Sequence, residues 1–197
     1  MKIENQVSSL IILIISRLIY IKDQMELNNL VKAAIFCALA VGMGFSLMLV
    51  PNVELITVIV FMSGLMLGWR WGTIVGGTAI FIYSGLNPMG SGLSFPPLFF
   101  MQILGMAITG FIGGIVRKFF VIKEINFINS ISLGLLGFFC TFIYDLLTLI
   151  AYPLSAGLGI SGIIAALIKG IGFTVLHEIS NAIVFVLTIP KVIRYLK

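Results

Sequence analysis

Long apolar runs separated by short connections make up most of this chain, and they constrain its fold more than any other feature. A segment that crosses a bilayer as a helix needs about 20 mainly apolar residues. Several runs approach or exceed this length, while charged residues make up only 10% of the 197 positions. A water-soluble domain carries roughly 25% charged residues. The sequence therefore predicts an all-α integral membrane protein that is covered mainly by lipid.

Six apolar segments are expected to form a compact bundle of transmembrane helices. The first five are residues 31–50, 55–68, 71–86, 98–116 and 131–152. The last run, 160–189, is too long for one straight span. We expect Gly170 and Gly172 to divide it into a short outer helix and a span over 171–188. Residues 25–197 would then form one six-helix membrane domain.

Among the connections between these segments, lysine and arginine occur only in alternate ones. They precede the first span, lie between the second and third and between the fourth and fifth, and follow the sixth. The other connections, 51–54, 87–97 and 153–162, contain neither residue. Cytoplasmic connections are the ones enriched in lysine and arginine. The pattern predicts a multi-pass protein of the cell membrane with both termini in the cytoplasm.

Residues 1–24 form an accessory segment that precedes the bundle. Its apolar run, 8–21, is interrupted by Arg17 and is shorter than a spanning helix requires. No small-residue cleavage site follows the run, which argues against a signal peptide. We expect either a helix that lies in the membrane interface or an extension ahead of a biological start at Met25.

Polar residues recur at three- and four-residue steps on the last two spans. The fifth span contains Tyr144 and Asp145, and the sixth contains His177, Glu178 and Asn181. Ionisable groups are costly in hydrocarbon, so they usually face a cavity or a partner. We therefore expect a polar pocket beneath the outer connections, which Gln102 of the fourth span could join. Hydrogen bonds that only hold the helices together would produce the same spacing.

Catalytic and metal-binding motifs are not apparent in the chain. The segment from His177 to Asn181 has asparagine where a metalloprotease helix places its second histidine. With one histidine in the chain, a site with several histidine ligands is excluded. No Walker-type nucleotide loop and no basic run with interleaved aromatics is present. We expect no enzyme activity, no cofactor, no metal and no nucleic acid partner.

Several features together resemble the substrate-binding S components of energy-coupling factor (ECF) vitamin transporters, over residues 25–197. Ala34 and Ala38 form a small-xxx-small pair on the first span, a spacing that lets another helix approach closely. The other matching features are the six short spans, Pro51-Asn52-Val53-Glu54, Tyr83-Ser-Gly-Leu-Asn87-Pro88, and the polar segment 177–181.

The resemblance implies a protein that binds a vitamin or related micronutrient outside the cell. It would then dock through Ala34 and Ala38 on a separate coupling subunit that carries two ATPases, and release its substrate inward. The candidate substrate-binding residues are Asn52, Glu54, Tyr83, Asn87, Gln102, Tyr144, Asp145, His177, Glu178 and Asn181.

The ligand class follows from the charges of this pocket. It contains acids and amides but no basic residue apart from Lys169 near its outer end, which suits a neutral or cationic ligand. The resemblance favours a cobalamin-type ligand, and pyridoxine, thiamine and queuosine types remain open.

Two other classes of function fit the same residues. A small membrane scaffold would use the polar stripes only to hold its helices together. A channel or stand-alone carrier should show inverted repeats or broken helices in matching positions, and the sequence has no convincing internal repeat.

Overall fold

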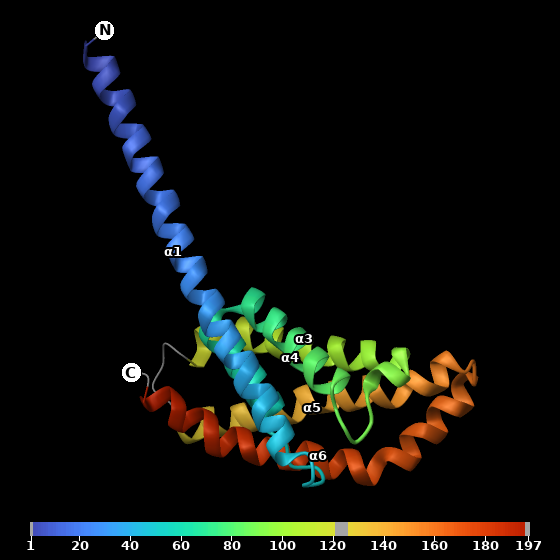
Figure 1. Ribbon diagram of the computed structural model, residues 1–197. Helices are drawn as coiled ribbons and strands as arrows, with labels where there is room; N and C mark the ends of the chain where they lie inside the picture. The colour runs from blue at the N-terminus through green and yellow to red at the C-terminus, as the bar shows by residue number, and fades with distance from the viewer. Residues whose placement is uncertain (1, 121–125, 196–197) are drawn as a thin grey trace. The chain divides into compact units, whose positions relative to one another are not determined.

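A computed structural model describes the backbone of residues 2–120 and 126–195, and the side chains in these ranges from residue 24 onward. Every regular element in these ranges is helical, which confirms the all-α prediction (Figure 1). The elements are α1 (Lys2–Leu47), α2 (Ile56–Leu67), α3 (Trp69–Gly85), the 3₁₀ turn η1 (Gly92–Ser94), α4 (Pro96–Phe120), α5 (Phe127–Ser155) and α6 (Gly159–Tyr195).

The chain divides into two compact units, residues 1–32 and residues 33–197. The first unit consists of the N-terminal part of α1. The second contains the C-terminal part of α1 and all other elements. The expected role of residues 1–24, as an interfacial helix or an extension, remains a prediction.

Four helical segments are long and apolar enough to cross a membrane: Gln24–Leu47, Pro96–Phe120, Phe127–Ser155 and Gly159–Tyr195. The other two helices are shorter, with 12 residues in α2 and 17 in α3. At 1.5 Å per residue they extend about 18 and about 26 Å, less than the roughly 30 Å of a hydrocarbon core. Length and composition thus support four spans, and six crossings remain a prediction.

The expected division of the last apolar run is wrong, because α6 continues unbroken from Gly159 to Tyr195. A Cβ atom at Gly170 would lie 2.7 Å from the side chain of Leu149 in α5. This glycine therefore permits close packing of two helices. A glycine costs a helix only about 1 kcal/mol relative to alanine, too little to break a long packed helix. Pro153 likewise lies within α5, which continues to Ser155.

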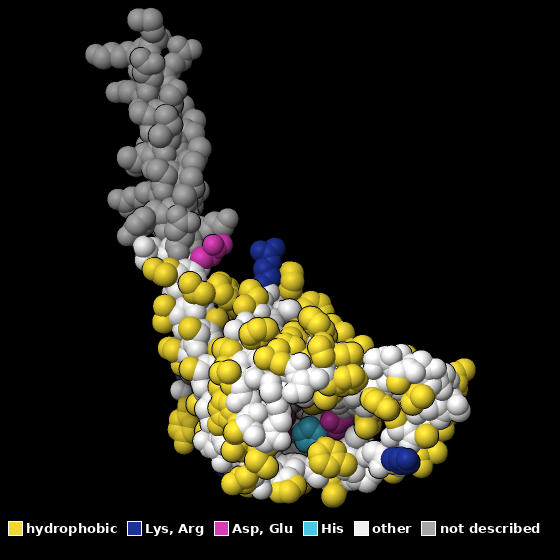
Figure 2. Space-filling model, turned by 45° about the vertical axis from the view of Figure 1, so that its right-hand side comes forward, with side chains coloured by type: hydrophobic (Ala, Val, Ile, Leu, Met, Phe, Trp, Pro, Cys, Tyr) yellow, Lys and Arg dark blue, Asp and Glu magenta, His cyan; other side chains and the backbone are white. Residues whose placement is uncertain are grey.

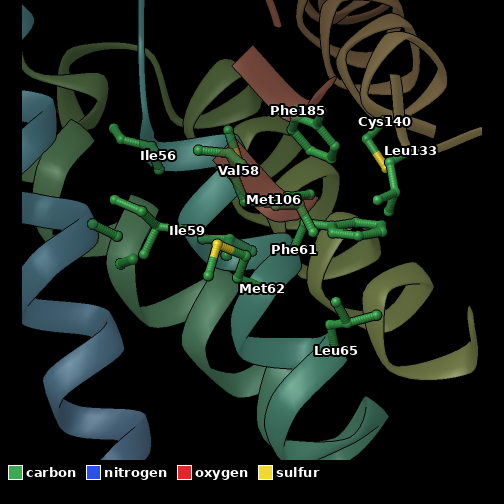
Figure 3. Packing of buried hydrophobic residues seen from close by; sticks show 14 of the residues in the cluster. Ile56, Val58, Ile59, Phe61, Met62, Leu65, Met106, Leu133, Cys140 and Phe185 are labelled. Carbon is green, nitrogen blue, oxygen red and sulfur yellow. The ribbon is translucent and has the colours of Figure 1, made fainter. Parts of the chain in front are cut away.

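The short helix α2 forms the centre of the second unit. Ten of its 12 residues, from Ile56 to Leu65, are buried, and it packs against α3, α4, α5 and α6. The rings of Phe61 in α2 and Phe185 in α6 are fully buried, with centroids 5.1 Å apart (Figure 3). A helix that is apolar on all sides is typical of a buried position.

Glycines let α2, α3 and α4 approach one another closely. A Cβ atom at Gly64 of α2 or at Gly72 of α3 would overlap the carbonyl oxygen of Gly110 in α4. A Cβ atom at Gly110 would in turn overlap the carbonyl oxygen of Gly72. Small residues allow such contacts between helix backbones. Gly68, with φ of 94°, makes the tight turn that joins α2 to α3.

Candidate functional site

Glu54 lies just before α2, and its carboxylate caps the first turn of that helix. Oε2 accepts hydrogen bonds from the backbone N–H groups of Ile56 at 2.9 Å and Thr57 at 3.2 Å, and Oε1 accepts one from the Thr57 hydroxyl. The side-chain amide of Asn181 in α6 donates to Oε1 at 3.3 Å. A negative charge at a helix N-terminus is stabilised by the helix dipole. These contacts fix the carboxylate and attach α6 to the start of α2.

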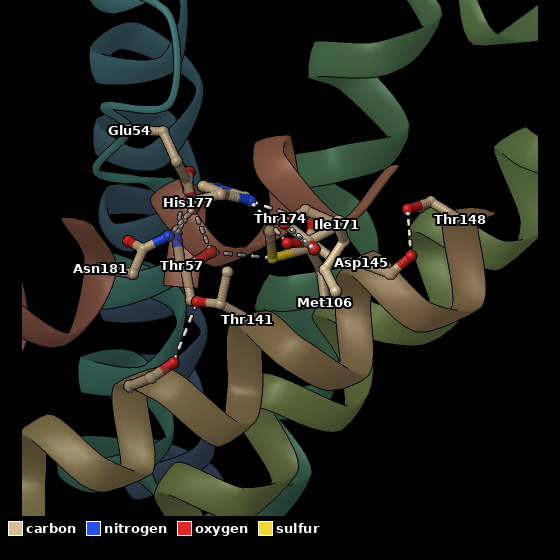
Figure 4. Close-up of polar contacts among 11 residues, drawn as sticks. Glu54, Thr57, Met106, Thr141, Asp145, Thr148, Ile171, Thr174, His177 and Asn181 are labelled. Atoms are coloured by element: carbon tan, nitrogen blue, oxygen red, sulfur yellow. Dashed lines mark hydrogen bonds and ion pairs between the residues drawn. The ribbon is translucent and has the colours of Figure 1, made fainter. Parts of the chain in front are cut away.

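The ring of His177 lies between two carboxylates that come from different parts of the fold (Figure 4). Nδ1 donates to Asp145 of α5, with distances of 3.0 Å to Oδ1 and 3.1 Å to Oδ2. Nε2 lies 3.8 Å from Oε1 of Glu54. Only 8% of His177 and 5% of Asp145 is exposed. His177 thus connects the N-terminus of α2 with α5 and α6 inside the bundle.

The pKa of the Glu54 carboxyl reflects this arrangement. Burial by itself raises the pKa, because it disfavours the charged form. Interactions with His177 and hydrogen bonds from Thr57 outweigh burial and hold the pKa below its ordinary value. The Glu54 carboxyl is therefore ionised at neutral pH and contributes a fixed negative charge.

A cavity of about 230 Å³, here called the Glu54 cavity, opens beside this carboxylate. It is bounded by the end of α1, the connection before α2, α3 and α6. Its lining includes Gly44, Asn52, Glu54, Tyr83, Phe173 and His177. Figure 2 shows histidine and acidic side chains at the floor of a hollow in the face drawn. The site therefore combines an acid, an imidazole and an amide with aromatic side chains.

Two asparagine oxygens in this region lack a hydrogen-bond donor. Oδ1 of Asn52 and Oδ1 of Asn181 are buried without a partner among the described residues. Asn52 also has φ of 58°, in the left-handed region that costs most residues energy. Buried polar atoms in native proteins are nearly always paired. Of the two residues, only Asn52 lines the Glu54 cavity, where a ligand group that donates a hydrogen bond would satisfy its oxygen.

A second cavity, of about 180 Å³, lies between α5 and α6 and is called here the Asp145–Glu178 cavity. Its polar lining consists of Asp145, Glu178 and Thr174. The rest of its wall is apolar, from Phe142, Leu146, Leu149, Leu167 and Ile171. No lysine or arginine lines this cavity or the Glu54 cavity. Both spaces are therefore lined by acids, and His177 is the one side chain in their described linings that can carry a compensating positive charge.

The structure brings most of the candidate binding residues to these two cavities or into contact with their carboxylates. They are Asn52, Glu54, Tyr83, Asp145, His177, Glu178 and Asn181. The sequence predicted a single pocket, whereas His177 and its carboxylate partners separate two cavities.

The other three candidates, Asn87, Gln102 and Tyr144, line neither cavity. Asn87 accepts a hydrogen bond from the backbone of Met89 at 2.9 Å and so stabilises a turn. Gln102 accepts one from the Ser84 hydroxyl at 2.5 Å, which connects α3 with α4. Tyr144 packs against the hydrophobic core. These contacts are structural, and binding roles for the three residues remain predictions.

Sequence reasoning did not select Thr57 or Phe173. Thr57 follows Glu54 by three residues, which is the reverse of the S/T-x-x-E order of a capping box, so no standard motif would have selected it. Phe173 precedes His177 by one helical turn, and the two rings lie 6.2 Å apart. Among the described side chains, no group of three or more histidine, cysteine and acidic residues is placed to hold a metal ion.

Comparisons of the chain with protein families, curated proteins and solved structures found no match. The fold and the site define an all-α protein with four helices able to cross a membrane and two acidic cavities among its helices. The similarity to ECF S components remains an interpretation of the residues.

Proposed function

We propose that this chain is the substrate-binding membrane subunit of an ECF-type importer. It captures a vitamin or related micronutrient outside and delivers it inward by docking on a coupling subunit with two ATPases. The observation that carries the proposal is the Glu54 cavity, where a charged carboxylate, His177 and an unpaired Asn52 oxygen border one space. In this proposal the chain crosses the cell membrane six times, with α2 and α3 as short crossings and both termini in the cytoplasm.

The charges of the site favour a ligand that is neutral or cationic and that donates hydrogen bonds. Glu54 and the nearby Asp145 can carry two negative charges, whereas His177 can carry only one positive charge. No lysine or arginine lines the cavity, so a multiply anionic ligand would be repelled. The unpaired oxygen of Asn52, which borders the cavity, favours a ligand that donates a hydrogen bond.

The size of the cavity limits the ligand further. Pockets for drug-sized ligands usually measure roughly 300–1,000 Å³, and the Glu54 cavity measures about 230 Å³. This volume favours a compact molecule of one or two rings, such as a pyridoxine- or thiamine-type ligand. A cobalamin-type ligand, which the resemblance favours, would require the connection before α2 to move.

Native mass spectrometry tests the proposal directly. The protein is purified in mild detergent from cells grown in a vitamin-rich medium, and the detergent solution is ionised by electrospray. We expect a bound small molecule whose mass identifies the substrate class. An empty protein that also shows no thermal shift across a panel of vitamins and cobalamin precursors would contradict a binding role and favour the scaffold.

Asn52→Gly should weaken binding of the identified ligand about tenfold or more without destabilising the free protein. Glycine adopts the left-handed backbone of position 52 without strain, so only the amide is lost. A hydrogen bond to a charged group contributes about 1.5–3 kcal/mol. Titration calorimetry measures the affinity, and thermal unfolding measures the stability. Asn126→Ser, at the exposed N-cap of α5, is the control, and equal affinity in Asn52→Gly would exclude a ligand contact.

Ala34→Trp and Ala38→Trp should reduce uptake at least tenfold while ligand binding is retained. Both alanines are exposed on α1, whereas Ala33 and Ala40 are buried. A bulky side chain at these positions therefore blocks close approach of a partner helix but does not disturb the bundle. Uptake by cells that carry the coupling module measures the effect. Leu39→Trp, also exposed on α1, is the matched control, and loss of binding in the alanine variants would assign them a structural role.

A further inference from the structure

Glu178 is a buried residue of α6 whose carboxylate faces a cavity and makes no direct hydrogen bond or ion pair with another described residue. Only 5% of it is exposed, and its side chain lines the Asp145–Glu178 cavity. A buried charge without a partner is costly, and a membrane environment offers little water to offset that cost. The charge of His177 acts on Glu178 only at a distance, because the ring itself contacts Asp145 and Glu54. A positive group in direct contact with Glu178 would therefore stabilise its ionised form.

The charges around Glu178 favour the binding of a cation. Asp145, on the same wall, shares the His177 ring with Glu54. One histidine, even when protonated, carries one positive charge for these three carboxylates. Lys169, on the same helix as Glu178, is exposed and does not line the cavity. A positively charged ligand in the cavity would complete the charge balance.

The lining indicates which kind of cation fits. Hard metal ions require about six or more oxygen ligands, whereas this cavity offers two carboxylates and the Thr174 hydroxyl. That hydroxyl donates to the carbonyl of Ile171 at 3.2 Å, so its lone pairs remain free to accept. Five of the eight lining residues are apolar. Three acceptors suit the three donors of a primary ammonium group, and the apolar wall suits a short hydrocarbon body.

We propose that the Asp145–Glu178 cavity binds a small primary ammonium compound, at a site separate from the Glu54 cavity. The ammonium group is held by Asp145, Glu178 and Thr174, and the hydrocarbon part packs against Leu146, Leu149 and Leu167. This site goes beyond the proposed import function, since its chemistry holds whether or not the Glu54 cavity carries a vitamin. The ammonium group could belong to a free amine or to the ethanolamine headgroup of a lipid.

Titration of the full chain in phosphatidylcholine nanodiscs with isobutylammonium chloride tests the proposal. We expect saturable binding, at least tenfold weaker in Glu178→Gln and unchanged in Glu26→Gln, which alters an exposed acid on α1. Two compounds serve as controls. Isobutanol has the same hydrocarbon part but no charge, and sodium chloride provides a cation without a hydrocarbon part. The proposal is overturned if the protein does not bind isobutylammonium, if Glu178→Gln binds it equally, or if either control compound competes equally well.

Two further variants keep the test decisive if Glu178→Gln folds poorly. Leu167→Trp fills the cavity but retains both carboxylates, so it should also lose isobutylammonium, and full binding would refute the location. Asn52→Gly, which alters only the Glu54 cavity, should bind isobutylammonium as the unaltered protein does; loss of binding there would place the ammonium in the Glu54 cavity. Adding phosphatidylethanolamine to the nanodiscs distinguishes the source: competition identifies the lipid headgroup, and no competition a free amine.

Discussion

Gly110→Ala should destabilise the protein by about 3 kcal/mol or more, although it adds only one methyl group. The new Cβ would overlap the backbone carbonyl of Gly72 in α3. The collision is with the backbone of a helix, so no side-chain rotation can relieve it. α4 cannot simply move away either, because its Gly110 carbonyl is also in close contact with Gly64 of α2. Thermal unfolding in detergent, followed by circular dichroism, measures the loss.

Gly172→Ala is the matched control for this prediction. It makes the same chemical change within α6, but a Cβ atom there would meet nothing within 4 Å. Alanine favours a helix over glycine by up to about 1 kcal/mol, so this variant should be as stable as the unaltered protein or slightly more stable. If Gly110→Ala were equally stable, then α2, α3 and α4 would not pack as closely as described.

The positions of the helices could be predicted well from the sequence, but the position of α2 within the bundle could not. Apolar length and the bounding Pro51 and Gly68 place a helix over 55–68, close to the observed α2 (Ile56–Leu67). A fully apolar helix has the same sequence pattern whether lipid or protein surrounds it. Its burial depends on contacts with four other helices, and no local pattern encodes these. For the same reason the sequence alone does not distinguish a helix break at Gly170 from the packing contact with Leu149 that the structure has.

The sequence predicted most residues of the candidate site, but not which of them contact one another. Helical spacing identified Asp145 on one span and His177 on the next, since costly polar groups in apolar runs are conspicuous. The contact of 3.0 Å between them depends on how α5 and α6 are rotated about their axes. Glu54 reaches the same ring from the connection before α2, and His177 lines one cavity whereas Asp145 lines the other. Such geometry arises only when the helices are assembled.

His177 and Asp145 should stabilise the protein mainly because each satisfies the buried polar group of the other. Asp145→Leu leaves Nδ1 of His177 without its acceptor, while Glu54 stays 3.8 Å from Nε2. Removing one member of a buried pair costs about 3–5 kcal/mol. The double variant Asp145→Leu/His177→Phe replaces both partners with apolar groups, a change that is often close to neutral. It should therefore recover most of the stability that the single variant loses. Glu54 would retain its hydrogen bonds from Ile56, Thr57 and Asn181.

A double-mutant cycle of unfolding free energies measures this coupling. Additive losses would show that the two side chains contribute independently, in conflict with the 3.0 Å contact. The same double variant separates stability from binding. If the polar residues only hold the helices together, an apolar pair that restores stability would also preserve every function of the protein. If they serve ligands, the restored protein should lose both the copurifying small molecule and isobutylammonium, because the carboxylate and the imidazole that contact them are gone.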